Sequence, residues 1–235
     1  MLSLYLREND LATAKLSFHS RRVAKICHLM PKVIDITGSF GPDRQKVETF
    51  IKAVFQDAYH ADISIHYPYL ISVCNEAGDI LAAAGFRYAY KSPLFLEQYL
   101  ATPIEQELTT LYDKPVTRRD IVEIGSLASL GSGASVFLYA ALASYLAFKQ
   151  VQYTVVTGTD DLYRHLKMLG LQPQKICEAD QTRLQGEGDD WGSYYATRPC
   201  VLTGSVQHGV ESLRRTLGSV YESQMPLRYY MGKLS

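Results

Sequence analysis

Two glycines in a short uncharged loop offer the clearest opportunity for ligand binding in this sequence. Gly131 and Gly133 follow an apolar run at 121–129 and precede a helix-forming run at 134–148. A helix that begins after such a loop presents free backbone N–H groups and the positive end of its dipole, which favour an anion such as a pyrophosphate. The alternative is a tight strand-to-helix connection that binds no ligand.

Charged side chains near this loop could also do chemistry. Glu123 lies inside the apolar run, where burial should raise the pKa of a carboxylate toward neutrality; the alternative is a buried carboxylate held by a Lys or Arg. Arg87, at the end of a strand-like run, could meet an acidic ligand group or form a surface ion pair. Glu97 is free to face a pocket, whereas Glu105 is predicted to complete a capping box with Thr102.

An aromatic cluster lies in the last third of the chain. Trp191, the single tryptophan, is followed by Tyr194 and Tyr195. Aromatic side chains with polar tips at the edge of a loop often line a ligand channel, but they also commonly cover a core. Both interpretations stay open.

The periodicity of apolar residues predicts the elements that position these side chains. Helices are expected at 43–59, 160–169 and 206–221, with two more in 94–112 divided at Pro103, and strands at 69–75, 80–88, 121–129 and 153–159. The polar linker 76–79 predicts an antiparallel hairpin. The strand, helix and strand of 121–159 predict a parallel pair with a right-handed crossover. The fold class is therefore α/β or mixed α+β.

The two ends of the chain are predicted to be extensions of a central domain. We divide the sequence into an extension at 1–40, a domain at 41–204 and a helical extension at 205–235. Residues 15–30 mix basic and apolar residues and are predicted to form an amphipathic helix that Pro31 ends, either as a solvated face or as a docking surface. The C-terminal helix has one apolar face, which would pack on the domain or on a second subunit in a homodimer.

Composition excludes several classes of function. Lys+Arg and Asp+Glu both number 24, so no overall field attracts nucleic acid or an anionic membrane. The four cysteines are far apart and have no histidine at metal-ligand spacing, which argues against a metal site and for a reducing compartment. Charged residues at positions 7, 8 and 10 argue against a secretory signal, and the apolar helical run is too short to span a bilayer. The cytoplasm is the expected location.

Four stretches of this sequence resemble known families. The order of elements, with LYRHLKMLGL at 162–171, resembles the GNAT acyltransferase fold. FLEQYLATPIEQ at 95–106, IVEIGSLAS at 121–129 and WGSYYATRPCVLTG at 191–204 resemble the thermostable haemolysin family, over roughly 40–204. The middle stretch is also distantly similar to acyl-homoserine-lactone synthases. The resemblance implies a GNAT-like central mixed sheet with a splayed parallel strand pair, flanked by helices.

The resemblance implies acyl transfer from a thioester. Glu123 would be the base, with Glu97 as a second candidate and Tyr195 as the acid, and a backbone N–H near Leu127 would stabilise the oxyanion. The substrate would meet Arg87, Ser126, Trp191 and Tyr194. The residues that would bind the donor are Leu127, Ala128, Ser129, Gly131, Ser132, Gly133 and Ala134. The donor, acyl-CoA or an acyl carrier protein thioester, would be a co-substrate, with no tightly bound cofactor.

The sequence departs from these families at three points. The loop at 130–135 carries no charge, which favours acyl carrier protein over coenzyme A. Leu166 stands where many GNAT enzymes have a tyrosine acid, so that another side chain would have to substitute. Ser126 and Leu127 stand where lactone synthases have a Ser-Arg pair, which argues against lactone synthesis. The candidates for the acid are Tyr163, His165 and Tyr195, and the candidate docking points for a carrier protein are Arg118, Arg119, Arg164 and Lys167.

The leading hypothesis is a cytoplasmic GNAT-like acyltransferase that moves an acyl group, a fatty one, from acyl carrier protein or coenzyme A to a small amine. One alternative is a membrane-active protein, as the family name suggests, which would need an exposed amphipathic surface on 15–30 or on the C-terminal helix. The other is a catalytically inactive module that binds acyl thioesters, which Leu166 suggests.

Overall fold

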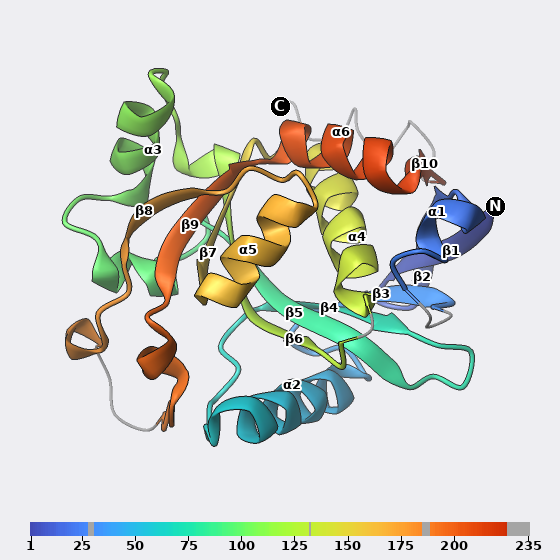
Figure 1. Cartoon of the computed structure of the whole chain (residues 1–235), viewed down its shortest axis with the longest axis horizontal. Helices are drawn as coiled ribbons and strands as arrows, with labels where there is room; N and C mark the ends of the chain where they lie inside the picture. Colours follow the sequence, from blue (N-terminus) through green and yellow to red (C-terminus); the bar gives the residue numbers. More distant parts are fainter. Residues whose placement is uncertain (28–30, 132, 185–188, 225–235) are drawn as a thin grey trace.

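The computed structural model describes residues 1–27, 31–131, 133–184 and 189–224. It contains a ten-stranded mixed sheet with helices on both faces (Figure 1). The strands are β1 (Leu2–Glu8), β2 (Leu11–Phe18), β3 (Val33–Thr37), β4 (Tyr69–Cys74), β5 (Ile80–Tyr88), β6 (Ile121–Ser129), β7 (Tyr153–Gly158), β8 (Gln174–Glu178), β9 (Cys200–Ser205) and β10 (Val220–Ser223). Their order across the sheet is β10-β2-β1-β3-β4-β5-β6-β7-β9-β8.

Alternate residues of the central strands face two different layers of helices. The α-helices are α1 (Ser20–Val23), α2 (Arg44–Tyr59), α3 (Ile104–Tyr112), α4 (Ala134–Phe148), α5 (Asp160–Met168) and α6 (Val206–Leu217), with a 3₁₀ turn η1 at Phe95–Tyr99. On β5, Ala82 and Ala84 pack in the cluster that contains α4 and α6, whereas Ala83 packs in the cluster that contains α2. Because neighbouring residues of a strand point to opposite faces, α2 and α4 cover opposite sides of the sheet (Figure 1).

Most of the predicted central elements are confirmed. The expected helices at 43–59, 160–169 and 206–221 correspond to α2, α5 and α6, and the hairpin is β4 and β5, paired antiparallel. The C-terminal helix ends at Leu217, four residues earlier than predicted, because Gly218 adopts a left-handed conformation (φ 64°). The apolar face of α6 packs on the core shared with α4.

The amphipathic helix predicted at 15–30 is wrong. In the described part of this segment, residues up to Phe18 belong to β2, and helix follows only at Ser20–Val23; residues 28–30 lie outside the described structure. Leucines two residues apart in β1 and apolar residues two apart in β2 alternate with the period of a strand, which buries them on one face. The N-terminal strands β1, β2 and β3 lie in the same sheet as the strands of the predicted central domain, since β1 pairs with β3 and β3 with β4.

The capping box predicted at Thr102 is also wrong. Helix α3 begins at Ile104 with Pro103 as its N-cap, and the N–H of Ile104 donates to the Glu97 carboxylate (3.5 Å) rather than to Thr102. The Thr102 hydroxyl instead donates to Glu107 (2.6 Å), and the Glu105 carboxylate accepts a hydrogen bond from Arg118 (3.0 Å). A cation within reach of Glu105 competes with the backbone N–H groups for its carboxylate.

The parallel pair β6 and β7 separates, as predicted, part of the way along its length. The two strands pair only from Ile121 to Ile124 on β6 and from Tyr153 to Val156 on β7. Beyond this point β6 continues beside β5 and β7 continues beside β9. The register of β6 with β5 shifts at the same place, where Ser126 has a positive φ of 49°.

The N-terminal hairpin should contribute to the stability of the whole fold. Leu6 on β1 is 0% exposed, whereas Leu11 at the start of β2 is 72% exposed. We expect Leu6→Ala to lower the free energy of unfolding by about 2–5 kcal/mol, because it leaves a cavity in the core. Leu11→Ala, the same change at an exposed position, should alter it by less than about 0.5 kcal/mol. Urea unfolding followed by circular dichroism would measure both, and equal effects would show that the hairpin is not part of the core.

Candidate active site

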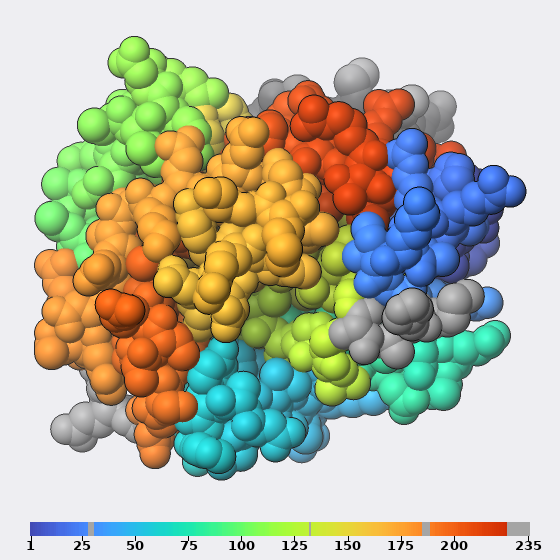
Figure 2. All heavy atoms as spheres, in the orientation of Figure 1, coloured from blue at the N-terminus to red at the C-terminus, as the bar shows by residue number. Residues whose placement is uncertain are grey.

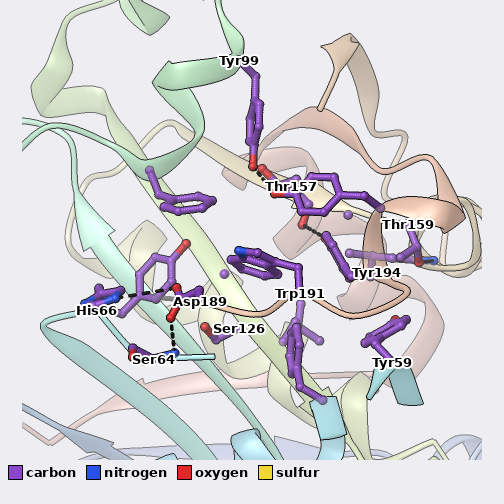
Figure 3. Close-up of a pocket in the computed structure, with 18 of the residues that line it drawn as sticks. Tyr59, Ser64, His66, Tyr99, Ser126, Thr157, Thr159, Asp189, Trp191 and Tyr194 are labelled. Carbon is purple, nitrogen blue, oxygen red and sulfur yellow. Dashed lines mark hydrogen bonds and ion pairs between the residues drawn. The ribbon is translucent and has the colours of Figure 1, made fainter. Parts of the chain in front are cut away.

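A cavity of about 120 Å³ lies where β6 and β7 separate. Its lining comes from α2, the segment between α2 and β4, the end of β5, the turn η1, the diverging ends of β6 and β7, the helix α5 and the loop before β9. Aromatic side chains dominate, with Phe55, Tyr59, Tyr67, Phe95, Tyr99, Trp191, Tyr194 and Tyr195. Figure 3 shows Trp191 in the middle of this lining, with Ser126 of β6 on one side and Thr157 of β7 on the other.

A buried polar atom without a partner marks this cavity as a place for a ligand. In the described part of the chain, three buried side-chain polar atoms lack a hydrogen bond, and two of them belong to residues that line the cavity. Of these two, Arg87 Nε faces Glu123 in an ion pair, whereas Thr157 Oγ1 has no partner. A buried polar atom that makes no hydrogen bond carries a desolvation cost of about 1–3 kcal/mol. A polar ligand or water that binds here would recover part of this cost.

Only part of β6 borders the cavity, and that part includes some but not all of the residues predicted to bind the acyl donor. Gly125, Ser126 and Leu127 line it, beyond the last pair with β7. Ala128 and Ser129, which pair with β5, do not line it. Ser126 and Leu127 line the cavity and pair with neither β5 nor β7, so their backbone groups are the candidates for binding an oxyanion.

Glu123 is almost completely buried one pair before the separation. It is 1% exposed, and its carboxylate accepts hydrogen bonds from the N–H groups of Phe95 and Leu96, both at 2.9 Å. Arg87 Nε lies 3.3 Å from Glu123 Oε2, an ion pair without hydrogen-bond geometry. Burial raises the pKa of Glu123 to about 7, although Arg87 and the two N–H groups act in the opposite direction. Glu123 is therefore both a carboxylate with a raised pKa and a buried carboxylate paired with an arginine, which the sequence had offered as alternatives. Its side chain is not among those that line the cavity.

Tyr67 joins Glu123 to the cavity and was missed by the sequence analysis. Its ring lines the cavity and packs directly on Gly85 and Gly125, where any side chain would overlap it. Burial, together with the charge of Glu123, raises the pKa of Tyr67 well above its ordinary value. Gly85 and Gly125 face each other across β5 and β6. Such a pair of strand glycines is the sequence signal that something approaches the backbone closely.

The aromatic side chains predicted to bind substrate all reach the cavity. The hydroxyl groups of Tyr195 and Tyr99 form a short hydrogen bond, and Tyr194 donates to the carbonyl of Thr157 (3.3 Å), as Figure 3 shows for the labelled partners. Burial raises the pKa of Tyr195, while its bond with Tyr99 lowers it. Of the three candidate acids, Tyr195 lines the cavity; Tyr163 and His165 do not.

Glu97 is occupied elsewhere. Its carboxylate makes hydrogen bonds with Arg118 (2.6 and 3.1 Å) and accepts one from the N–H of Leu94 (2.8 Å). The residue lies outside the cavity lining, although its neighbours Phe95 and Tyr99 are part of it. The sequence-based candidacy of Glu97 as a catalytic group thus has no support from the geometry, because the carboxylate holds the turn η1 in place.

The glycine loop after β6 is closed on one side by the N-terminal segment. Gly131 and Gly133 both have left-handed conformations, with φ of 80° and 81°, and α4 begins at Ala134; Ser132 lies outside the described structure. The carbonyl of Ile26 approaches Gly133 so closely that a side chain there would overlap it. An anion at the start of α4 would lie beside this carbonyl oxygen, which carries partial negative charge.

A second cavity of about 100 Å³ lies on the opposite side of the separated strands. Leu127 and Leu162 line both cavities and therefore lie at the boundary between them. Apolar residues of α4, α5 and α6 form most of its walls, among them Tyr139, Leu142, Leu166, Leu171, Val206 and Leu213. Leu166, at the position expected for an acid, is thus part of an apolar wall. No pattern in the sequence predicted this cavity.

Two classes of site are not found in the described residues. No group of three or more His, Cys, Asp or Glu in the part of the chain that the structure covers could hold a metal ion. Among the helices described, none is both long and apolar enough to cross a membrane.

Comparison with solved structures identifies the fold. The acyl-homoserine-lactone synthase LasI superposes with a TM-score of 0.50 at 16% identity, over 74% of this chain and 89% of that one. TofI in an apo form gives 0.52 at 10% identity, over 77% and 95%. FeeM, an N-acyl amino acid synthase from uncultured soil microbes, gives 0.53 at 11% identity, over 77% and 99%. The mixed α/β fold is therefore GNAT-like, as the sequence resemblance implied.

Comparison by sequence identifies the family. No curated protein matches the chain. The family model described as thermostable hemolysin matches residues 37–210, a span close to the 40–204 over which the sequence motifs suggested the resemblance. Since this match covers well over half of the sequence, the chain belongs to the thermostable hemolysin family.

Proposed function

We propose that this protein is an acyltransferase that moves a fatty acyl group from the thioester of acyl carrier protein or coenzyme A to a small amine. One observation carries the proposal: β6 and β7 separate between an aromatic, partly polar cavity and an apolar one, with Leu127 at the boundary. A thioester carbonyl at this boundary would have its acyl chain in the apolar cavity and its reacting carbon open to a nucleophile in the other.

The residues around the boundary supply the proton transfers that the reaction needs. The amine attacks the thioester carbon, the carbonyl oxygen becomes an oxyanion beside the backbone at Ser126 and Leu127, and the C–S bond breaks to give an amide and a thiolate. The proton lost by the amine passes through the Tyr67 hydroxyl to Glu123, and Tyr195 gives a proton to the thiolate. A carboxyl group whose pKa is about 7 is suited to accept a proton near neutral pH.

The glycine loop bears on the choice of donor. The Ile26 carbonyl beside Gly133, and the absence of charge in the loop sequence, disfavour a pyrophosphate at the start of α4 and support the carrier protein thioester. In Figure 2, yellow-green atoms from the stretch around residue 130 reach the surface between gold α5 and cyan α2, where the donor's arm would enter. Among the candidate docking points, Arg118 is half-buried between Glu97 and Glu105, whereas Arg164, paired with Asp161, and Lys167 are both exposed on α5 and so are better placed than Arg118.

Of the two alternatives, the inactive binding module retains support. Glu123 is held by Arg87, and Leu166 replaces the usual acid, yet both cavities would still accept an acyl thioester. The membrane-active alternative loses its surface, because the described residues of the predicted N-terminal helix include β2 of the sheet and the apolar face of α6 packs on the core. Soluble thioester donors and the spacing of the cysteines favour the cytoplasm.

Turnover of acyl thioesters separates the enzyme from the inactive module. We expect the purified protein to release thiol from fatty acyl thioesters only when an amine is present. Tyr67→Phe keeps the ring on Gly85 and Gly125 but removes the hydroxyl, and should lower kcat by about 100-fold, as expected for lost general base catalysis. The exposed carboxylate variant Glu76→Gln is the matched control and should leave kcat unchanged. Thermal stabilisation by the thioester without thiol release would instead support the binding module.

The proton affinity of Glu123 predicts how stability depends on pH. Its pKa in the folded protein, about 7, lies above the ordinary 4.5, so the folded state binds a proton that the unfolded state has lost between these values. The contribution of Glu123 to the free energy of unfolding should therefore be fully present below about pH 4.5 and fall as the pH rises to about 7, by roughly 3 kcal/mol in total. Above that pH it should stay constant.

Subtracting a variant isolates this contribution from those of the other titratable groups. Glu123→Gln keeps one oxygen that can accept a hydrogen bond from Phe95 or Leu96 but does not titrate. The difference in unfolding free energy between the wild type and this variant, measured by urea unfolding from pH 4 to 8, should fall across the stated window. A difference that rises with pH would mean that Arg87 lowers the pKa of Glu123 below its ordinary value.

A further inference from the structure

The aromatic cavity presents a carboxylate to a ligand. Among the described residues that line it, Asp189 is the one with a carboxylate and Arg87 the one with a guanidinium. Asp189 Oδ1 accepts a hydrogen bond from the N–H of Ser64 (2.8 Å), and Oδ2 lies 3.8 Å from Nε2 of His66, which is largely exposed (Figure 3). The Ser64 bond fixes the side chain at the edge of the cavity, and the negative charge is not cancelled by a lysine or arginine in this lining.

Arg87 cannot offer the matching positive charge. Its Nη2 donates to the carbonyl of His66 (3.0 Å) and its Nη1 to that of Pro93 (3.3 Å), while Nε faces Glu123. The guanidinium also stacks over the Tyr67 ring, 4.7 Å from its centre. A carboxylate on a ligand would need the fork of an arginine that is free to bind it in a bidentate manner. It would also meet Asp189, a like charge.

The rest of the lining suits a flat apolar body of limited size. The Trp191 ring lies 5.8 Å from Phe95, 5.5 Å from Tyr194 and 5.8 Å from Tyr195, measured between ring centres. The volume, about 120 Å³, is close to the roughly 150 Å³ of an engineered cavity that binds benzene. Aromatic faces also attract ammonium groups. The cavity therefore matches one ring with a cationic amine.

We propose that the acyl acceptor is a primary amine on a single flat ring or a similar apolar body, without a carboxylate. This deepens the proposed function, on which it rests. The ammonium form binds beside Asp189 with its ring among the aromatic side chains, gives one proton to water, and attacks the thioester as the neutral amine. Free amino acids, which carry a carboxylate next to the amine, are excluded by the charge of Asp189 and by the engagement of Arg87.

Trp191 allows the proposal to be tested without an acyl donor. It is the single tryptophan of the chain and it lines the cavity, so its fluorescence reports on ligands that bind there. We would titrate the protein at pH 8 with 2-phenylethylamine and with phenylalanine, which differ only by the carboxylate. The amine should bind at least about 100-fold more tightly, since like charges brought together in an interface cost several kcal/mol. Equal or tighter binding of phenylalanine, or no binding of the amine, would overturn the proposal.

A variant of Asp189 and a neutral ligand distinguish the effect of the Asp189 charge from the effect of the ligand's ring. Asp189→Asn keeps an oxygen that accepts the Ser64 hydrogen bond but removes the charge, and should reduce the preference for the amine to within about 10-fold. The control Glu76→Gln removes a charge far from the lining and should keep the full preference. In the wild type, 2-phenylethanol, with the same ring and no charge, should bind between the two. A preference that survives Asp189→Asn would contradict the role given to this carboxylate.

Turnover distinguishes the failure of this inference from the failure of the proposed function. If the amine binds but no thioester yields thiol, the inference about the cavity stands and the proposed transfer fails. If thiol is released and phenylalanine is acylated in preference to 2-phenylethylamine, the transfer stands and the inference fails. Mass spectrometry of the product identifies which acceptor carries the acyl group.

Discussion

The separation of β6 from β7 after Ile124 is the constraint on which the rest of the structure depends. Parallel strands normally continue their hydrogen bonds, and leaving backbone groups without partners is costly in a buried sheet. Here each strand keeps its other neighbour, β5 or β9, so the sheet stays intact while one gap opens inside it. Both cavities, and the backbone groups between them, exist because of this gap.

Glu123 connects this gap to the chain that follows β5. Its carboxylate accepts the N–H groups at the start of η1, while Arg87 on the neighbouring strand faces the same oxygen atoms. Glu97 and Arg118 hold the other side of that turn. The wall that carries Phe95 and Tyr99 is thus fixed by two buried or half-buried carboxylates, and the burial that makes Glu123 a structural anchor also raises its pKa to about 7. Structural and catalytic roles need not exclude each other at this residue.

Sequence patterns were sufficient where the relevant interactions are local. The helix predicted at 160–169, the hairpin of β4 and β5 and the helix after Gly133 follow from periodicity and turn residues, and each is confirmed. The sequence could also place Trp191, Tyr194 and Tyr195 together, because they lie in one short loop. It failed where the partner is remote in the chain. Nothing near Glu97 indicates that Arg118, 21 residues away, will bind its carboxylate.

The N-terminal segment and Tyr67 show a second kind of failure, in which a local pattern permits two structures. The basic residues at 21 and 22 made residues 15–30 resemble an amphipathic helix. Leu16 and Phe18 instead lie on one face of a strand, because β2 pairs with β1, a contact that periodicity alone does not reveal. From the sequence, Tyr67 is an aromatic residue in a loop, and nothing indicates its role until Gly85 and Gly125 are known to face each other. The two glycines leave room for the Tyr67 ring, which lies on the proposed route from the Glu123 carboxylate to the cavity.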